Sequence, residues 1–277
     1  MPEPRLQNRQ GTYAQTSPNG YRLEVIGAPR ALDPDRREAL TRDFVELSLK
    51  ASGGRDWNTY VPGQVGWVNY YRTEGARPQD YDRLALVYAG SHLAHFTALN
   101  VLWLDEAHPV LWIHVAITDP RHQGSGLLSM STRALLAPEW MRSVAPVTYP
   151  VFRTPNPVVY EAMRAFASTH LGSPEIRVRS WHPQIAEDGR LRAVPDDVRS
   201  MATTLAKTLS PDCPWDEDHF VIRGYYRQFG PLYSEDTQFP CRVAGTREYF
   251  AEHVHLDTQD GLLVICEVET NAGRRAE

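Results

Sequence analysis

Three strand-like runs separated by short connections, and then a glycine-containing loop, occupy the middle of the sequence. The runs Leu84 to Tyr88, His92 to Leu104 and Val110 to Thr118 are rich in Val, Leu, Trp and Phe, which are residues that favour strands. The breaks between them, Ala89 to Ser91 and Asp105 to Ala107, are short. Because short connections join antiparallel neighbours, the pattern predicts an antiparallel meander.

The loop that follows, Asp119 to Gly126, leads into a helical stretch from Leu127 to roughly Met141. A strand, a glycine turn and a helix direct free backbone N–H groups and the positive end of a helix dipole at one spot. Gly124 and Gly126 leave room for a phosphate, and Arg121 adds positive charge at the rim. The loop is neither a Walker A loop nor a dinucleotide fingerprint, because it lacks Gly-Lys-Ser/Thr and a third glycine. It therefore predicts an anion site, with a bare turn before a helix as the alternative.

The segments on either side predict a mixed α/β fold. Asp33 to Lys50 has helical spacing, with Asp33 as N-cap. Val147 to Arg153 follows a crossover helix, so we expect it to lie parallel to the third strand of the meander. Asn156 and Pro157 then begin another helix. Beyond Ser173 we expect one helix, over Pro195 to Leu209. Three strands are expected there as well, over Ile176 to Trp181, His219 to Tyr226 and Leu262 to Val268.

Composition excludes several classes of protein. The 277 residues are 42% hydrophobic and 23% charged, as in an ordinary globular chain. The formal net charge of −5 gives no general attraction to nucleic acid. No apolar run reaches the ~20 residues that cross a bilayer, and Met1 to Gln10 lacks the apolar core of a signal peptide. The three cysteines are few and widely spaced, as expected of reduced thiols in the cytoplasm. We therefore expect a cytoplasmic protein, taken to be bacterial, with no membrane and no nucleic acid as partner.

The sequence gives little support for a metal site or for a serine hydrolase. His92 and His95 are expected on opposite faces of a strand, and His253, His255 and Asp257 would bind zinc only with ligands from elsewhere. We therefore predict no metal. The run Gly124-Ser125-Gly126 does not match the hydrolase elbow Gly-x-Ser-x-Gly.

The run from Trp112 to Leu127, and above all Arg121-x-x-Gly124-x-Gly126, resembles the acyl-CoA-binding segment of the GNAT superfamily of N-acyltransferases. The register Gln123-x-x-Gly126-x-Leu128 matches the same signature less well, and both registers stay open. The similarity extends over roughly Tyr21 to Leu171. It implies a twisted, mostly antiparallel mixed sheet with helices on both faces and a C-terminal extension.

The resemblance also implies a ligand and a set of site residues. Acetyl-CoA or another acyl-CoA would be the co-substrate, with its diphosphate on the loop and its pantetheine arm along the end of the preceding strand. The cofactor-binding residues implied are Val115, Ile117, Thr118, Arg121, His122, Gln123, Gly124, Ser125, Gly126, Leu127 and Asn156.

Two catalytic residues are expected for transfer to an amine. Tyr160 resembles the tyrosine that protonates the leaving thiolate, although it follows Asn156 by four residues where the family commonly has seven. His114 is the candidate base, since the ordinary pKa of histidine, near 6.5, suits a base at neutral pH. Asp105 and Glu106 are alternative bases.

The function expected is transfer of an acetyl or other acyl group from coenzyme A to an amine of a small molecule or peptide. The alternatives are an inactive GNAT-like acyl-CoA-binding or regulatory module and a structural protein whose loop binds nothing. We expect a loose tail over residues 1–20, an acyl-CoA-binding domain over 21–172, and a segment over 173–277 that completes the sheet or forms a smaller domain. A homodimer is a further expectation, and the aromatic stretch Trp57 to Tyr71 is expected to form part of the acceptor pocket.

Overall fold

The computed structural model describes residues 12–17, 19–52, 66–169, 175–229, 233 and 237–270. The chain divides into two compact units. The first comprises residues 1–59, 67–100 and 114–140, and the second comprises residues 60–66, 101–113 and 141–277. Strands β4 (His92–Trp103) and β5 (Pro109–Thr118) each run from one unit into the other.

The first unit is an antiparallel meander. It contains β1 (Thr12–Thr16), β2 (Tyr21–Ile26) and β3 (Arg83–Ala89). β2 pairs with β1 on one side and with β3 on the other, and β3 pairs with β4, all antiparallel. The strand order continues from β4 to β5. The meander predicted from the short connections is therefore confirmed.

Helices cover both faces of this meander. On β4, Phe96 stacks 3.9 Å from Phe44 of α1 (Pro34–Ala51). The neighbouring residue His95 hydrogen-bonds instead to Ser131 of α3 (Leu127–Leu135). Because successive strand residues face opposite sides, α1 and α3 lie on opposite faces of the sheet. The shorter elements of this part are η1 (Pro29–Ala31), α2 (Gly66–Tyr70), η2 (Pro78–Asp80) and η3 (Pro120–His122).

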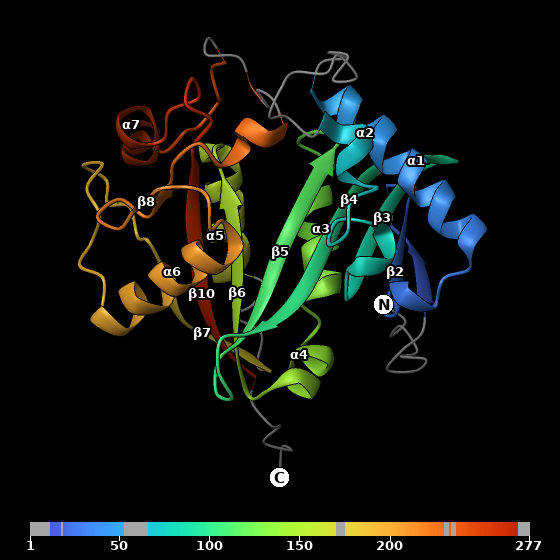
Figure 1. Cartoon of the computed structure of the whole chain (residues 1–277), viewed down its shortest axis with the longest axis horizontal. Helices are drawn as coiled ribbons and strands as arrows, with labels where there is room; N and C mark the ends of the chain where they lie inside the picture. Colours follow the sequence, from blue (N-terminus) through green and yellow to red (C-terminus); the bar gives the residue numbers. More distant parts are fainter. Residues whose placement is uncertain are drawn as a thin grey trace. The chain divides into compact units, whose positions relative to one another are not determined.

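In the second unit, β10 is the central strand (red in Figure 1). β10 (Gly261–Thr270) pairs antiparallel with β6 (Val147–Thr154) along one edge and with β7 (Ile176–His182) and the two-residue β9 (Val221–Ile222) along the other. The equally short β8 (Trp215–Asp216) pairs with β9. β5 and β6 are parallel, and their ladder joins Val110–Trp112 to Tyr149–Val151.

Helices also contact both faces of this part of the sheet. On β6, Phe152 lies 5.8 Å from Trp181, whose ring packs against Tyr160 of α5 (Pro157–Thr169). The next residue, Arg153, hydrogen-bonds instead to Ser210 at the end of α6 (Asp196–Leu209). The remaining elements are α4 (Pro138–Val144), η4 (Tyr225–Phe229) and α7 (Ala244–His253). A mixed fold with a mostly antiparallel sheet and helices on both of its faces is thus confirmed.

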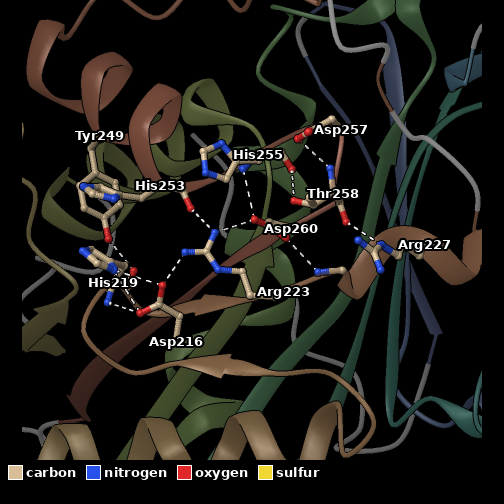
Figure 2. Close-up of polar contacts among 11 residues, drawn as sticks. Asp216, His219, Arg223, Arg227, Tyr249, His253, His255, Asp257, Thr258 and Asp260 are labelled. Carbon is tan, nitrogen blue, oxygen red and sulfur yellow. Dashed lines mark hydrogen bonds and ion pairs between the residues drawn. The ribbon is translucent and has the colours of Figure 1, made fainter.

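An ion-pair cluster holds the segment after α6 to the start of β10. Figure 2 shows Arg223 between two carboxylates, Asp216 and Asp260. The Asp260 side chain has no exposed surface, and its second oxygen accepts a hydrogen bond from the backbone N–H of Gly224. Removal of Arg223 would leave the carboxylate of Asp260 buried without its cation, so these contacts tie the irregular chain around β8 and β9 to the residue before β10.

Three sequence expectations need correction, and one helix was not expected at all. The predicted loose tail contains β1, which pairs with β2 along its whole length. The predicted helix to Met141 ends at Leu135 because Pro138, which lacks an N–H, begins a separate helix. The strand expected over His219 to Tyr226 is reduced to β9, since Phe220 and Gly224 have positive φ angles, which strands do not accommodate. Finally, α7 was not expected.

Some expectations fall partly outside the described residues. Of the aromatic stretch Trp57 to Tyr71, residues 57–65 lie outside, and the rest contains α2. No helix in the described part of the chain has the length and apolar character needed to cross a membrane.

Candidate functional site

The glycine loop between β5 and α3 is exposed and open. Gly124 and Gly126 have φ angles of +77° and +76°, a conformation that glycine adopts without strain. A Cβ placed on either residue would meet no other atom within 4 Å. Gly126 is the N-cap of α3 and therefore offers no side chain to its first turn. A ligand can approach the loop backbone directly.

The backbone N–H groups of this loop remain available. The first hydrogen bond of α3 runs from the N–H of Met130 to the carbonyl of Gly126. Within the described part of the chain, no acceptor is recorded for the N–H groups of Gly124, Gly126 and Leu127. Unpaired N–H groups at the start of a helix, together with the helix dipole, favour an anion.

Asp119 and Arg121 fix the beginning of the loop. The Arg121 guanidinium donates to both carboxylate oxygens of Asp119, at 3.0 and 2.6 Å, and the Arg121 backbone N–H donates to the first of them. These hydrogen bonds lower the pKa of the Asp119 carboxyl to about 2, against the opposing effect of burial. The Arg121 side chain is 69% exposed. Arg121 therefore orders the loop, and part of its positive charge still faces solvent.

The other predicted loop residues lie on the same exposed turn. The Nδ1 atom of His122 lies 3.0 Å from the Tyr21 hydroxyl of β2. Gln123 and Ser125 are exposed, whereas Leu127 points into the core.

A buried polar network holds the segments on both sides of the loop. His95 of β4 has no exposed surface. Its Nδ1 lies 2.7 Å from the Thr118 hydroxyl at the end of β5, and its Nε2 lies 2.8 Å from the hydroxyls of Thr97 and Ser131. Burial lowers the pKa of His95 to about 3, so the ring is neutral. The network joins β4, the strand before the loop and the helix after it.

The predicted base, His114, is half-buried on β5 and has an aromatic partner. The Tyr70 hydroxyl of α2 lies 2.6 Å from Nε2 of His114. The Tyr81 ring stands edge-on to the imidazole at 5.3 Å. Tyr70 was not singled out from the sequence as a catalytic residue. Its only signal there was membership of the aromatic stretch expected beside the acceptor.

β5 departs from regular alternation between His114 and Thr118. Residues four apart in a regular strand share a face. His114 contacts Tyr70, which packs beside Tyr71 on the α1 side of the sheet, whereas Thr118 contacts His95 on the α3 side. An irregular strand exposes backbone groups that a regular ladder would pair. This stretch contains the half-buried residues Val115 and Ile117, both predicted ligand contacts.

In the second unit, Asn156 caps α5 as expected. Its side-chain oxygen accepts a hydrogen bond from the N–H of Val158 at 2.8 Å. Its side-chain nitrogen donates to the Tyr233 hydroxyl at 3.3 Å. Burial raises the pKa of Tyr233, so this hydroxyl keeps its proton. Tyr233 is a residue whose position the sequence did not reveal.

Tyr160, the predicted proton donor, is a core residue. It has no exposed surface, and its hydroxyl donates to the Pro183 carbonyl at 2.9 Å. Burial raises its pKa. The shortened spacing from Asn156 places the ring among Trp181 and Phe250. This geometry assigns Tyr160 to packing.

The remaining candidates are placed as follows. Asp105 accepts hydrogen bonds from Ala107 and His108 in the exposed turn before β5, where Glu106 is also exposed. His253 stacks on His219 at 4.1 Å rather than facing His255. Among the described residues, no group of three or more His, Cys, Asp or Glu side chains is arranged to hold a metal ion.

The comparisons with known proteins gave matches among solved structures only. No family model and no curated protein matches the sequence. A GNAT-family acetyltransferase from Streptococcus pneumoniae is similar at 10% identity, with 58% of this chain and 87% of that chain covered and a TM-score of 0.34. The PaiA N-acetyltransferase from Thermoplasma acidophilum in complex with coenzyme A is similar at 11% identity, covering 52% and 87%, with a TM-score of 0.34.

An aminoglycoside acetyltransferase from an uncultured soil metagenomic sample is similar at 12% identity. The match covers 61% of this chain and 99% of that chain, with a TM-score of 0.36. These TM-scores lie below 0.5, and the fold follows from the strand order and register of this chain itself.

Proposed function

We propose that this chain is an N-acyltransferase of the GNAT type, which takes an acyl group from coenzyme A and transfers it directly to an amine. The observation that carries the proposal is the open glycine loop, whose unpaired N–H groups lie at the start of α3. A diphosphate is the anion that such a loop fits, because several N–H donors converge on it without a competing side chain.

The residues present fit acyl-CoA. The N–H groups of Gly124, Gly126 and Leu127 would bind the diphosphate, with Gln123 and Ser125 beside them. The backbone of the irregular stretch Val115 to Thr118 would hold the pantetheine arm. When bound, acyl-CoA supplies an acyl group activated as a thioester.

The proposed base is the pair of Tyr70 and His114 acting as a relay. An amine must lose a proton as it becomes an amide. The Tyr70 hydroxyl can accept this proton while it passes its own proton to Nε2 of His114, since the two atoms are 2.6 Å apart. A base of this kind needs no carboxylate, and β5 contains neither Asp nor Glu.

Tyr160 is unsuited to protonating the leaving sulfur. Its hydroxyl is buried and donates a hydrogen bond to the Pro183 carbonyl.

The experiment that tests the proposal follows thiol release from acetyl-CoA with a panel of primary amines, amino acids and peptides. We expect turnover with at least one amine, and its loss in Tyr70→Phe/His114→Gln. The absence of turnover with every acyl-CoA and every amine would contradict the enzymatic function.

A second candidate function is an inactive module that only binds acyl-CoA. The core position of Tyr160 favours it, because the proton donor suggested by the family pattern is unusable. A rise in melting temperature with coenzyme A, without turnover, would identify such a module, since a ligand bound only by the folded state stabilises it.

A further inference from the structure

His95 of the first unit connects the two ends of the glycine loop. The loop begins after Thr118, the last residue of β5, and ends where α3 begins at Leu127. The Nδ1 atom of His95 lies 2.7 Å from the Thr118 hydroxyl. Its Nε2 atom lies 2.8 Å from the hydroxyl of Ser131 in α3. One buried imidazole therefore joins the residue before the loop to the helix after it.

This connection continues to the first turn of α3. The Ser131 hydroxyl donates its single proton to the carbonyl of Leu128 at 3.0 Å, so it accepts a proton in its contact with His95. The imidazole is neutral because burial lowers its pKa. Its one proton is therefore on Nε2, and Nδ1 accepts the hydroxyl proton of Thr118. The hydrogen bonds run in one direction, from Thr118 across the imidazole to the carbonyl of Leu128, and we call this chain the His95 link.

A backbone hydrogen bond beside the His95 link holds the same end of the loop. The N–H of Asp119 donates to the carbonyl of Ala94 on β4 at 2.9 Å. Ala94 directly precedes His95, and Asp119 directly follows the last residue of β5. Two neighbouring residues of β4 thus hold two neighbouring residues at the start of the loop. These bonds keep Thr118 on the α3 side of the sheet, where the regular alternation of β5 would not place it.

Packing alone does not account for the polar residues around the ring. His95, Thr97 and Ser131 have no exposed surface. Apolar side chains could fill this space without the cost of removing polar groups from water. A buried network whose members are all hydrogen-bonded restricts each of them to one orientation. The imidazole therefore fixes geometry, namely the spacing between the two ends of the glycine loop.

We infer that His95 is a positioning residue for the binding of acyl-CoA. The N–H groups proposed to bind the diphosphate, those of Gly124, Gly126 and Leu127, lie between the two ends that the His95 link holds. Several donors bind one anion well only when they converge on it, so a shift of either end weakens binding. The inference rests on the proposed acyl transfer and concerns the shape of the loop rather than contact between His95 and the coenzyme.

Calorimetric titration with coenzyme A tests the inference on variants that preserve side-chain shape. Thr118→Val removes the hydroxyl that begins the His95 link and should weaken binding by at least about tenfold. Thr118→Ser keeps the hydroxyl and should restore most of that affinity. The matched control is Thr97→Val, because the Thr97 hydroxyl lies 2.8 Å from both Nε2 of His95 and the hydroxyl of Ser131 but outside the link. This variant should lose stability and bind coenzyme A as the wild type does.

His95→Gln tests whether Thr118 acts through the ring. It removes the Nδ1 atom that accepts from Thr118, so adding Thr118→Val to it should cause little further loss of affinity. Additive losses would show that the Thr118 hydroxyl contacts coenzyme A directly, and would overturn the inference. In turnover, the effect of Thr118→Val should be a rise in KM for acetyl-CoA with a much smaller change in kcat, since the proposed base lies outside the link.

The outcomes separate this inference from the proposed function. If the wild type, Thr118→Val and Thr97→Val bind coenzyme A equally, the inference is overturned and the proposed function stands. An equal loss of affinity in both valine variants would also overturn it, because the network would then act only through the stability of the fold. No binding by the wild type would contradict the proposed function itself. The threonine variants need no change at His95, so the test holds even if His95→Gln fails to fold.

Discussion

The hydroxyl of Tyr70 and Nε2 of His114 are 2.6 Å apart although the two residues are separated by 44 positions in the sequence. Tyr70 ends a short helix, whereas His114 lies within β5. Both side chains are half-buried, so the pair is shielded from bulk water without being closed off.

The first prediction concerns this pair. His114→Gln should lower kcat/KM by about 10²- to 10⁴-fold, the usual contribution of an acid–base group. Tyr70→Phe should produce a loss of the same order, and the double variant should lose little more, because both residues act on one proton. Steady-state kinetics of thiol release tests this. Additive losses would show that the two side chains do not form a relay.

The second prediction concerns Tyr160. Tyr160→Phe should lower the free energy of unfolding by roughly 1–3 kcal/mol, because it leaves the buried Pro183 carbonyl without its hydrogen bond. Its kcat should match the wild type. Denaturant unfolding and steady-state kinetics test this, and a large loss of kcat with unchanged stability would restore Tyr160 as the proton donor.

The third prediction is a pH dependence of stability from His95. Its pKa is about 3 in the folded protein, against an ordinary value of 6.5. Between these values the unfolded chain binds a proton there and the folded chain does not. The stability contribution of the neutral ring is therefore complete above pH 6.5 and falls as the pH is lowered, by up to about 1.4 kcal/mol per pH unit.

Melting temperatures of the wild type and His95→Gln between pH 4 and 7.5 test this. The variant should have the flatter profile, whatever its absolute stability. Parallel profiles would show that His95 is not held neutral in the folded protein.

The fourth prediction compares two arginines. Arg223→Met should lower the free energy of unfolding by about 3–5 kcal/mol, because it leaves Asp216 and the buried Asp260 without their cation. Arg153→Met should change it by less than about 1 kcal/mol, since it removes a cation without a recorded carboxylate partner and keeps side-chain packing on two rings. Thermal unfolding measures both. A large loss in Arg153→Met would contradict this comparison.

The sequence predicted features that depend on near neighbours. Asp33 caps α1 by accepting the N–H of Arg36, three residues away, and Asn156 caps α5 in the same way. The meander and the glycine loop likewise follow from local pattern and short connections.

Features that depend on distant residues were not predictable. The Tyr233 hydroxyl meets Asn156 across 77 positions. β1 is an edge strand with the sequence Thr-Tyr-Ala-Gln-Thr, which contains no Val, Ile, Leu or Phe, so its pairing with β2 left no hydrophobic pattern in the sequence. α7 has no side-chain N-cap to mark its start. Tyr160 was assigned to catalysis because its position along α5 resembled a family pattern, whereas its surroundings are set by β7 and α7.

The most direct test of the account is calorimetric titration of coenzyme A into the wild type, Gly126→Ala and Gly90→Ala. Both glycines have positive φ angles and open space around an added Cβ, so the two substitutions impose a similar backbone strain of about 1–2 kcal/mol. Gly126 lies in the glycine loop, whereas Gly90 lies in the turn between β3 and β4. We predict that the wild type and Gly90→Ala bind coenzyme A with the same affinity and that Gly126→Ala binds at least about tenfold more weakly. Absence of binding to the wild type, or equal binding by all three proteins, would contradict the assignment of the loop to the diphosphate.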